Sequence, residues 1–442
     1  MKTNRLELGL VRTGVLMDEV LMEILDHLGI VYREASEGDF PLLISSTKPR
    51  DALFNKPLLV ADDVLPMNEV LNTLSGTSYL EDRDCLDLKI NELENRLLDH
   101  IKDLYLAEGL PLVRKWYWPN FSKACCVLTH DVDWLSYSPF HKIVYRSNPF
   151  PKLLKLVFKY LLLGEDYGYN IPEIIEIEKS RGVKSTFFLK TRYDEMEKAH
   201  MLQRLLKENG FEIGLHGTRD SHKNIDMLRD EIRSLENAVN SGIHGIRYHR
   251  LKFKPNFTWR LVEEAGLKYD STFSNSKYFG FKSQLCYPFH PVDPLLKRRL
   301  NILEIPMAFM DWTSLHRHYT YDECKSVMSR LMDTVYKYHG CFAVNFHNTY
   351  LNEESFQQVY ELFLWSLDET IGRGFWVTTG FECYQWWSMR ADLKLQLDLE
   401  ETIIKGESPL KEVPIIIDGV KDKETVAFIT DRFFKIDMRM IQ

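Results

Sequence analysis

Two carboxylates, Asp131 and Asp133, follow closely on an apolar run in the segment LTHDVDW (residues 128–134). The run 125–129 predicts a buried strand, so both acids stand at its end. Side chains two residues apart on a strand point the same way, and these two would share a face if the strand continues. Adjacent carboxylates repel each other and require a cation or a proton between them. Either acid alone would be interpreted as a cap or turn residue, but the pair predicts a metal or acid–base site.

Three later segments place titratable side chains at the ends of further predicted strands. His216 lies in EIGLHGTRDSH (212–222), where Asp220 and His222 follow; imidazole and carboxylate groups together suit Zn²⁺ or Co²⁺. Arg247, in GIRYHR (245–250), can pair with a carboxylate and hold it ionised. His347, in FAVNFHN (342–348), titrates near neutrality. Each segment alone is also compatible with an ordinary structural role, and their order at successive strand ends is the stronger signal.

The elements that must position these residues alternate in type between 123 and about 390. Strands are expected at 125–129, 183–189, 211–215, 245–248, 302–306, 341–346 and 375–378, and helices at 195–209, 227–239, 261–265, 324–338 and 356–371. Such alternation predicts a parallel sheet, and about seven repeats favour a barrel. In α/β barrels the chemistry is carried at the carboxyl ends of the strands.

The two flanks differ from this central part. Residues 5–64 combine short strand-like runs with one helical segment, 15–28, which ends before Gly29. The tail from about 395 alternates apolar and polar residues, as β-strands do. We therefore expect a small α/β domain at 1–118, a barrel at 119–392 and a small β-rich appendage at 393–442.

On these motifs, residues 123–390 resemble the NodB-homology polysaccharide deacetylases (carbohydrate esterase family 4), most of all the divergent branch with a His-Asp-Val-Asp first motif and an N-terminal α/β extension. The resemblance implies an α/β fold with a distorted (β/α)7 barrel. It also implies a hydrolase of carbohydrate metabolism that removes an acetyl group from an N-acetylated sugar or polysaccharide intermediate. That activity breaks a C–N bond other than a peptide bond. The implied cofactor is one divalent metal, zinc, with cobalt or nickel as alternatives.

Carried over residue by residue, the resemblance assigns a role to each motif. Asp131 becomes the general base, Asp133 and His216 become metal ligands, Arg247 is the arginine of the third motif, and His347 becomes the general acid. A backbone N–H within 248–250 would join the metal in holding the oxyanion.

The chain departs from the family pattern at four places. The usual Thr-Phe-Asp-Asp-Gly reads Thr-His-Asp-Val-Asp at 129–133. The third metal ligand is either His222, because imidazole is the commoner ligand, or Asp220, because it keeps the spacing. The proline normally found two residues after the arginine is His249. The acid that orients the catalytic histidine is either Asp270 or Asp311.

Two surface features suggest partners. Trp134, Tyr248 and Trp312 are expected to contact the substrate, because sugar rings stack on aromatic faces; the alternative is that they fill the core and rim. Residues 142–163 combine lysine and arginine with leucine and phenylalanine. Such a basic amphipathic helix can make weak contact with an anionic membrane surface, or it can pack on the barrel with its lysines in water.

Composition excludes several classes of protein. The 442 residues are 45% apolar and 27% charged, the mix of a globular chain. A net charge of −8, from 56 basic and 64 acidic residues, argues against a nucleic-acid binder. Seven cysteines form no CxxC pair, which argues against a zinc knuckle and favours reduced thiols. No signal-like apolar region follows the first residues, so a cytoplasmic location is expected. The oligomeric state is not predicted.

Two other functions are compatible with the same residues. The same residues could hydrolyse a different C–N bond, in a formamide or a ureide. The chain could also be a non-catalytic sugar-binding or scaffold protein. The joint presence of Asp131, Asp133, His216, Arg247 and His347 argues against the non-catalytic alternative, because binding alone does not require all five.

Overall fold

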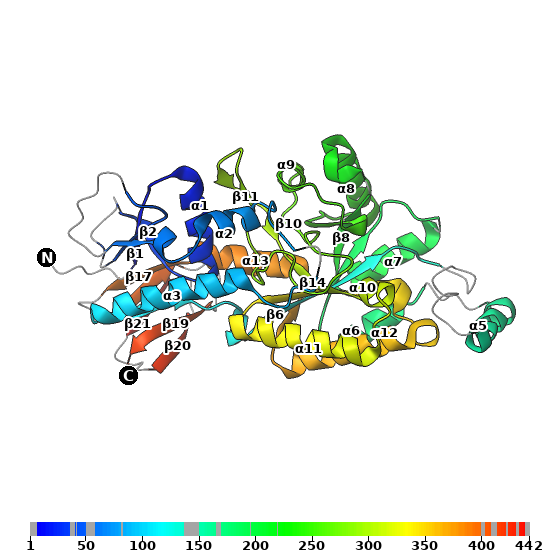
Figure 1. Ribbon diagram of the computed structural model, residues 1–442. Helices are drawn as coiled ribbons and strands as arrows, with labels where there is room; N and C mark the ends of the chain where they lie inside the picture. The colour runs from blue at the N-terminus through cyan, green and yellow to red at the C-terminus, as the bar shows by residue number, and fades with distance from the viewer. Residues whose placement is uncertain are drawn as a thin grey trace.

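The computed structural model describes residues 7–35, 40, 42–49, 58–80, 83–136, 150–164, 169–194, 196–218, 220–398, 403–407, 413–420, 423–429 and 433–437. A curled parallel sheet wrapped by helices forms its centre (Figure 1). The N-terminal sheet and strands β17–β21 lie at one end of the molecule, and helix α5 lies at the other (Figure 1). Among the described residues, no helix combines the length and apolar character needed to cross a bilayer.

The central sheet has the strand order β13-β10-β9-β8-β7-β6-β15-β14, and β16 also pairs with β6. Its strands are β6 (Cys125–Val132), β7 (Thr186–Leu189), β8 (Glu212–Gly217), β9 (Gly245–Tyr248), β10 (Tyr269–Asp270), β13 (Leu303–Glu304), β14 (Met307–Met310), β15 (Cys341–Asn345) and β16 (Trp376–Thr378). Neighbouring strands in this sheet are all parallel. The two ends of the order, β13 and β14, are separated in the chain by residues 305 and 306 alone, so the sheet must curl round. The predicted α/β fold of barrel type is therefore confirmed.

Helices connect these strands and cover the sheet. They are α5 (Phe150–Leu163), α6 (Ile171–Ser180), α7 (Met196–Glu208), α8 (Ile225–Val239), α9 (Thr258–Glu264), α10 (Asp311–His316), α11 (Tyr321–Tyr338), α12 (Glu353–Gly372) and α13 (Gly380–Asp392). Side-chain caps fix the starts of α8 at Asn224, α11 at Thr320 and α12 at Asn352. Helices α7, α8, α9, α11 and α12 match predicted segments, whereas α6, α10 and α13 were not predicted. The basic segment predicted at 142–163 is described from Phe150 onward, and residues 142–149 lie outside the described residues.

The N-terminal part contains a four-stranded parallel sheet of order β2-β1-β3-β4. Its elements are β1 (Leu8–Val11), α1 (Val15–His27), β2 (Tyr32–Glu34), β3 (Leu43–Ser45), β4 (Leu58–Val60), α2 (Met67–Leu74) and α3 (Lys89–Ala107). Gly29 ends α1 with φ +72, and a side chain there would lie 2.2 Å from the carbonyl oxygen of Lys115. Only glycine fits this turn, as the sequence predicted.

The C-terminal strands pair with each other and with a strand before the barrel. They are β17 (Lys394–Asp398), β18 (Ile403–Glu407), β19 (Val413–Val420), β20 (Lys423–Ile429) and β21 (Phe433–Asp437). A separate two-stranded sheet is formed within the barrel region by β11 (Val292–Asp293) and β12 (Arg298–Arg299). β19 pairs antiparallel with β5 (Leu112–Lys115), and Arg114 forms an ion pair with Asp418 at 2.7 Å. Two strands of the predicted β appendage, β19 and β20, thus form a three-stranded sheet with β5, which precedes the barrel, whereas β17, β18 and β21 form a separate sheet.

Candidate active site

The carboxyl ends of β6, β8 and β9 and the loop after β15 surround a cavity of about 440 Å³. Titratable residues line one part of it and aromatic residues line another: Asp131, Asp133, His216, His249 and His347, with Trp134, Trp312 and Tyr350. The carboxyl ends of the strands therefore carry a cluster of titratable residues, as the sequence predicted.

Asp133, His216 and His249 form the one group of the cavity whose ligand atoms all lie within 4.8 Å of one another, among the residues described. The Nε2 atoms of His216 and His249 lie 3.7 and 3.5 Å from Asp133 Oδ1. His216 Nδ1 bonds the carbonyl oxygen of Arg247 at 3.0 Å, which leaves Nε2 as the lone-pair atom. His216 Nε2 is buried and has no hydrogen-bond partner in the described part of the chain. Metal-binding histidines are typically oriented in this way by a carbonyl on the other ring nitrogen.

The protonation states of the three residues suit a cation. Burial lowers the pKa of His216, and it lowers the pKa of His249 to about 4, so both rings are neutral at pH 7. Burial would raise the pKa of Asp133, but the neighbouring histidines and Lys190 outweigh it and lower this pKa. Neutral imidazoles and an ionised carboxylate are the forms that bind a divalent metal. The donor set therefore fits the metal that the resemblance implies.

Lys190 supplies a positive charge at the same point. Its ammonium lies 2.6 Å from Asp133 Oδ1 and donates to the Asp133 carbonyl oxygen at 2.9 Å. It also lies over the ring of Trp134, 5.5 Å from the centroid. Two cations on one oxygen repel each other. A divalent ion on Oδ1 therefore requires the ammonium to move away from it.

Asp131 is held by partners on both of its carboxylate oxygens. Arg247 Nη1 lies 3.0 Å from Oδ1, and Asn345 Nδ2 donates to Oδ2 at 2.9 Å. The Asp131 N–H donates in turn to Asn345 Oδ1 at 3.1 Å. Burial would raise the pKa of Asp131, but Arg247 above all, with His216 and His347, lowers it. Asp131 is therefore an ionised, fixed carboxylate beside the triad rather than part of it.

His347 faces Asp131 across the cavity and is itself held by Asp311. Asp311 Oδ1 bonds His347 Nδ1 at 2.6 Å, and Oδ2 accepts the His347 backbone N–H at 2.7 Å. His347 Nε2 lies 3.9 Å from Asp131 Oδ2. Burial would lower the pKa of His347, but Asp311 outweighs it and the pKa rises to about 9. The ring is therefore protonated at neutral pH, and its Nε2 is the nitrogen that faces Asp131.

Of the two acids proposed to orient His347, Asp311 makes the contact. Asp270 instead accepts from the backbone N–H of Thr272 at 2.9 Å and also from its hydroxyl, and burial raises the pKa of Asp270 to about 7. Asp311 begins α10 directly after β14, the strand that pairs with β15 and so lies next to His347. The pairing of β14 with β15, rather than the spacing in the sequence, therefore determines that Asp311 and not Asp270 contacts His347.

The structure does not bring either predicted third ligand into the triad. The side chain of Asp220 is 60% exposed and pairs with Lys223 at 2.9 Å, although Asp220 lines a neighbouring cavity. The ring of His222 lies against Tyr248, with centroids 6.1 Å apart. His249 takes the third position instead. The signal was available, because His249 stands two residues after Arg247 and so continues the same strand face.

The chain turns sharply just after His249. Arg250 and Leu251 have φ of 60° and 51°, in the left-handed region that non-glycine residues seldom adopt. Such backbone strain tends to occur at functional sites, where the surrounding structure holds it in place. Both residues line the cavity, so this turn shapes the wall next to His249.

The predicted aromatic contacts divide into two cases. Trp134 and Trp312 line the cavity, as expected of substrate-contacting residues. Tyr248 is fully buried and is not part of the lining, because strand alternation turns it away from the face that carries Arg247. Its N–H donates to Thr272 Oγ1 at 3.0 Å, so this N–H is not available to an oxyanion. Tyr248 is corrected to a core residue.

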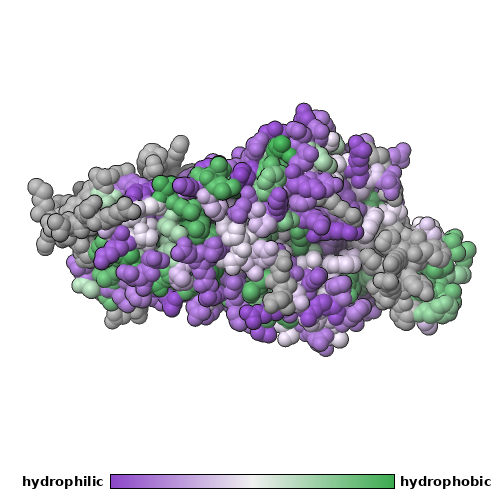
Figure 2. Space-filling view, turned by 45° about the horizontal axis from the view of Figure 1, so that its top comes forward, coloured by the Kyte–Doolittle hydropathy of each residue, from purple (hydrophilic) through white to green (hydrophobic). Residues whose placement is uncertain are grey.

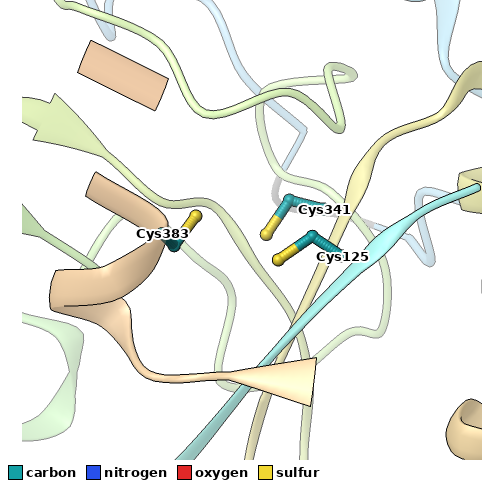
Figure 3. Close-up of side chains that lie close together, drawn as sticks. All are labelled: Cys125, Cys341 and Cys383. Atoms are coloured by element: carbon teal, nitrogen blue, oxygen red, sulfur yellow. The ribbon is translucent and has the colours of Figure 1, made fainter. Parts of the chain in front are cut away.

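A second group of metal-type ligands combines the first residues of β6 and β15 with a residue of α13. Cys125, Cys341 and Cys383 are fully buried, and their sulfur atoms turn toward one another within 4.8 Å (Figure 3). Burial raises the pKa of Cys125 and of Cys341, while hydrogen bonds from these two thiols outweigh burial at Cys383 and lower its pKa to about 6. We interpret these three cysteines as core thiols. Because thiols can also bind a metal, a measurement of metal content requires a cysteine variant as a control.

No protein-family model and no curated protein matches this sequence. Among solved structures, a protein assigned as a polysaccharide deacetylase from Mycobacterium smegmatis matches at 17% identity, covering 61% of this chain and 92% of that chain, with a TM-score of 0.43. The Puue allantoinase matches at 15% identity, 61% and 92% coverage and a TM-score of 0.43. A carbohydrate esterase family 4 pseudoenzyme from Bacillus anthracis matches at 16% identity, 60% and 66% coverage and a TM-score of 0.34. The function is therefore argued from the residues of the site.

Proposed function

We propose that this chain is a metal-dependent hydrolase that removes the acetyl group from an N-acetylated sugar or polysaccharide intermediate. The observation that carries the proposal is the pairing of Asp131 with His347 beside the triad, with Oδ2 and Nε2 separated by 3.9 Å. Their surroundings move the two pKa values apart, leaving Asp131 ionised and His347 protonated. Hydrolysis of an amide requires a general base that is ionised and a general acid that is protonated, and this cavity contains one of each.

Asp133, His216 and His249 are the residues that would hold the metal. Two imidazoles and a carboxylate suit zinc, and cobalt or nickel are also compatible. When bound, such an ion lowers the pKa of water and polarises an acyl carbonyl. The remaining chemistry falls to side chains of this chain.

Asp131 accepts the proton of the attacking water. Arg247 and Asn345 fix its two oxygens, so the base keeps one orientation and needs no reorganisation during the reaction. Arg247 also keeps it ionised, because its positive charge, 3.0 Å from Oδ1, lowers the pKa of Asp131.

His347 donates its Nε2 proton to the nitrogen of the leaving amine. An amide requires this step, because an amine expelled without a proton is a very poor leaving group. Asp311 holds Nδ1 and so keeps the ring turned with Nε2 toward the cavity. Trp134 and Trp312 offer aromatic faces at the cavity wall, which favours a sugar as the group that carries the nitrogen.

One observation favours a second candidate, a non-catalytic sugar-binding protein. The ammonium of Lys190 already neutralises Asp133 at 2.6 Å, which is the charge a metal would otherwise balance. If the lysine holds that oxygen permanently, the cavity can bind a sugar without turnover. Hydrolysis of a formamide or ureide uses the same base and acid and stays an alternative within the enzyme class.

The test is the metal content of the purified chain together with acetate release from N-acetylated oligosaccharides. We expect about one zinc per chain, lost in Asp133→Ala, His216→Ala and His249→Ala. The matched control is Cys383→Ala, which must keep the metal if the cavity, and not the thiol group, binds it. A chain that takes up no metal after supplementation would favour the binding protein. A metal-loaded chain that releases formate or ammonia but no acetate would favour the other C–N hydrolases.

A further inference from the structure

Helix α5 exposes a continuous apolar face. Of the fourteen large hydrophobic side chains that are exposed in the described part of the chain, five belong to this helix: Phe150 (74%), Leu154 (59%), Phe158 (62%), Leu161 (65%) and Leu162 (65%). Their spacing of three and four residues places them along one side of the helix. Figure 2 shows this as a hydrophobic patch at the end of the molecule where α5 lies. A patch of this kind marks a surface that binds a partner or a membrane.

The opposite side of α5 is attached to the rest of the protein. Leu156 is buried, with 1% of its surface exposed. Lys159 forms an ion pair with Glu354, in the first turn of α12. Lys152 lines a cavity together with Tyr319 and Tyr321. The helix is therefore held in place, and its apolar face points away from the protein.

The sequence segment that carries α5 has a charge opposite to that of the whole chain. From Trp134 to Gly164 the sequence contains no aspartate or glutamate and five basic residues: Lys142, Arg146, Lys152, Lys155 and Lys159. The whole chain carries a net charge of −8. Lys155 is exposed next to the apolar face. A positive segment on an acidic protein, combined with exposed leucine and phenylalanine, complements an anionic lipid surface.

The segment that carries α5 leaves and returns beside the cavity. Asn348 Nδ2 donates to the Trp134 carbonyl oxygen at 2.9 Å, near the point where the segment begins. Asn170 Nδ2, at its end, donates to the Asn348 carbonyl oxygen at 2.8 Å. Asn348 follows His347 directly in the chain. Residues on both sides of α5, Trp134 and Asn170, are therefore hydrogen-bonded to Asn348, the residue next to His347.

We propose that α5 binds the surface of an anionic lipid bilayer. Its apolar face enters the boundary between headgroups and acyl chains, and Lys155 stays among the headgroups. Binding by such a helix combines buried apolar area with electrostatic attraction. The proposal concerns α5 and does not depend on whether the cavity hydrolyses an amide.

The test is co-sedimentation of the full chain with phosphatidylcholine vesicles prepared with and without phosphatidylglycerol. We expect binding to the anionic vesicles that weakens as salt is added. The double substitution Leu154→Ser with Phe158→Ser should reduce binding at least about tenfold, because both side chains lose their apolar burial. Lys155→Glu should reduce binding to anionic vesicles by about fivefold or more.

Leu295→Ser is the matched control. Leu295 is 72% exposed and lies far from α5 in the sequence, so its loss should leave vesicle binding unchanged. Lys155→Glu changes one exposed side chain and tests the proposal even if the double variant unfolds. Equal binding of wild type and Lys155→Glu, or no binding to anionic vesicles, would overturn the proposal. A dimer in light scattering that the double variant converts to monomer, without vesicle binding, would assign the face to a second copy of the chain instead.

Discussion

The ammonium of Lys190 lies 2.6 Å from Asp133 Oδ1, the oxygen that the Nε2 atoms of His216 and His249 approach to 3.7 and 3.5 Å. One oxygen is thus shared by a lysine and by the two residues best arranged to bind a metal. The side chain of Lys190 is 22% exposed. Lysine has a flexible stem, so its ammonium can leave the oxygen while the backbone stays in place.

Replacing Lys190 with methionine should therefore strengthen metal binding. The substitution keeps an unbranched side chain and removes the competing charge, and we expect zinc to bind about tenfold more tightly. Competition with a chromophoric chelator measures this directly. An unchanged Kd would mean that the lysine leaves Asp133 at no cost.

The third ligand can be identified by comparing three alanine variants. His249→Ala should lose the metal, because its Nε2 is one of the three converging atoms. His222→Ala and Asp220→Ala should keep it, since neither side chain belongs to the group. Elemental analysis of the three proteins, purified in parallel, decides the point. Loss of metal from His222→Ala alone would restore the assignment made from ligand type, and loss from Asp220→Ala alone would restore the one made from spacing.

Much of the site could be predicted from the sequence because strand alternation is a local rule. Asp131 and Asp133 were paired by their spacing of two, and the same rule applied to Arg247 would have indicated His249. The roles of Asn345, Lys190 and Asp311 depend on which strands are neighbours. That order is set by the whole barrel and leaves no local pattern.

The fold shows the same division between local and distant signals. Buried runs and helical periodicity located most barrel strands and helices, and Gly29 marked the end of α1. The pairing of β5 with β19 joins residues about 300 positions apart, and an alternating pattern does not identify its partner strand. The C-terminal strands were therefore predicted as strands, but the pairing of β19 with β5 was not predicted.

Asp131→Asn should separate catalysis from metal binding. The amide keeps the shape and the contact with Arg247 but cannot accept a proton, so kcat should fall by about 10² to 10⁴. Metal content should stay at the wild-type level, because Asp131 is outside the triad. Elemental analysis and acetate release are measured on the same preparation. Full activity in this variant would remove Asp131 from the role of base.

The pH dependence of activity should report His347. Its pKa of about 9 keeps the acid protonated through neutrality, so kcat should decline as pH rises through that value. Asp311→Asn removes the carboxylate that raises this pKa, and the decline should move toward lower pH. His347→Ala should lower kcat while the metal is retained. If the pH at which kcat declines is the same in Asp311→Asn as in the wild type, the decline reports the titration of a group other than His347.

A buried histidine outside the cavity should make stability depend on pH. His27, on α1, lies between Glu94 on α3, at 2.9 Å, and Glu23, at 3.2 Å, with no exposed surface. Burial would lower the pKa of His27, but the two carboxylates outweigh it and raise this pKa to about 9. In the unfolded chain the pKa returns to its ordinary value near 6.5.

The sign follows from these two values. A raised pKa means that the folded chain holds the proton more tightly, so the stabilisation is complete below about pH 6.5 and is lost as pH rises through about 9. The difference in free energy of unfolding between wild type and His27→Gln should therefore shrink over this range, by on the order of 3 kcal/mol. Urea unfolding at several pH values measures it, with His100→Gln as the control because His100 is exposed. A constant difference from pH 6 to pH 10 would show that His27 is not charged in the folded chain.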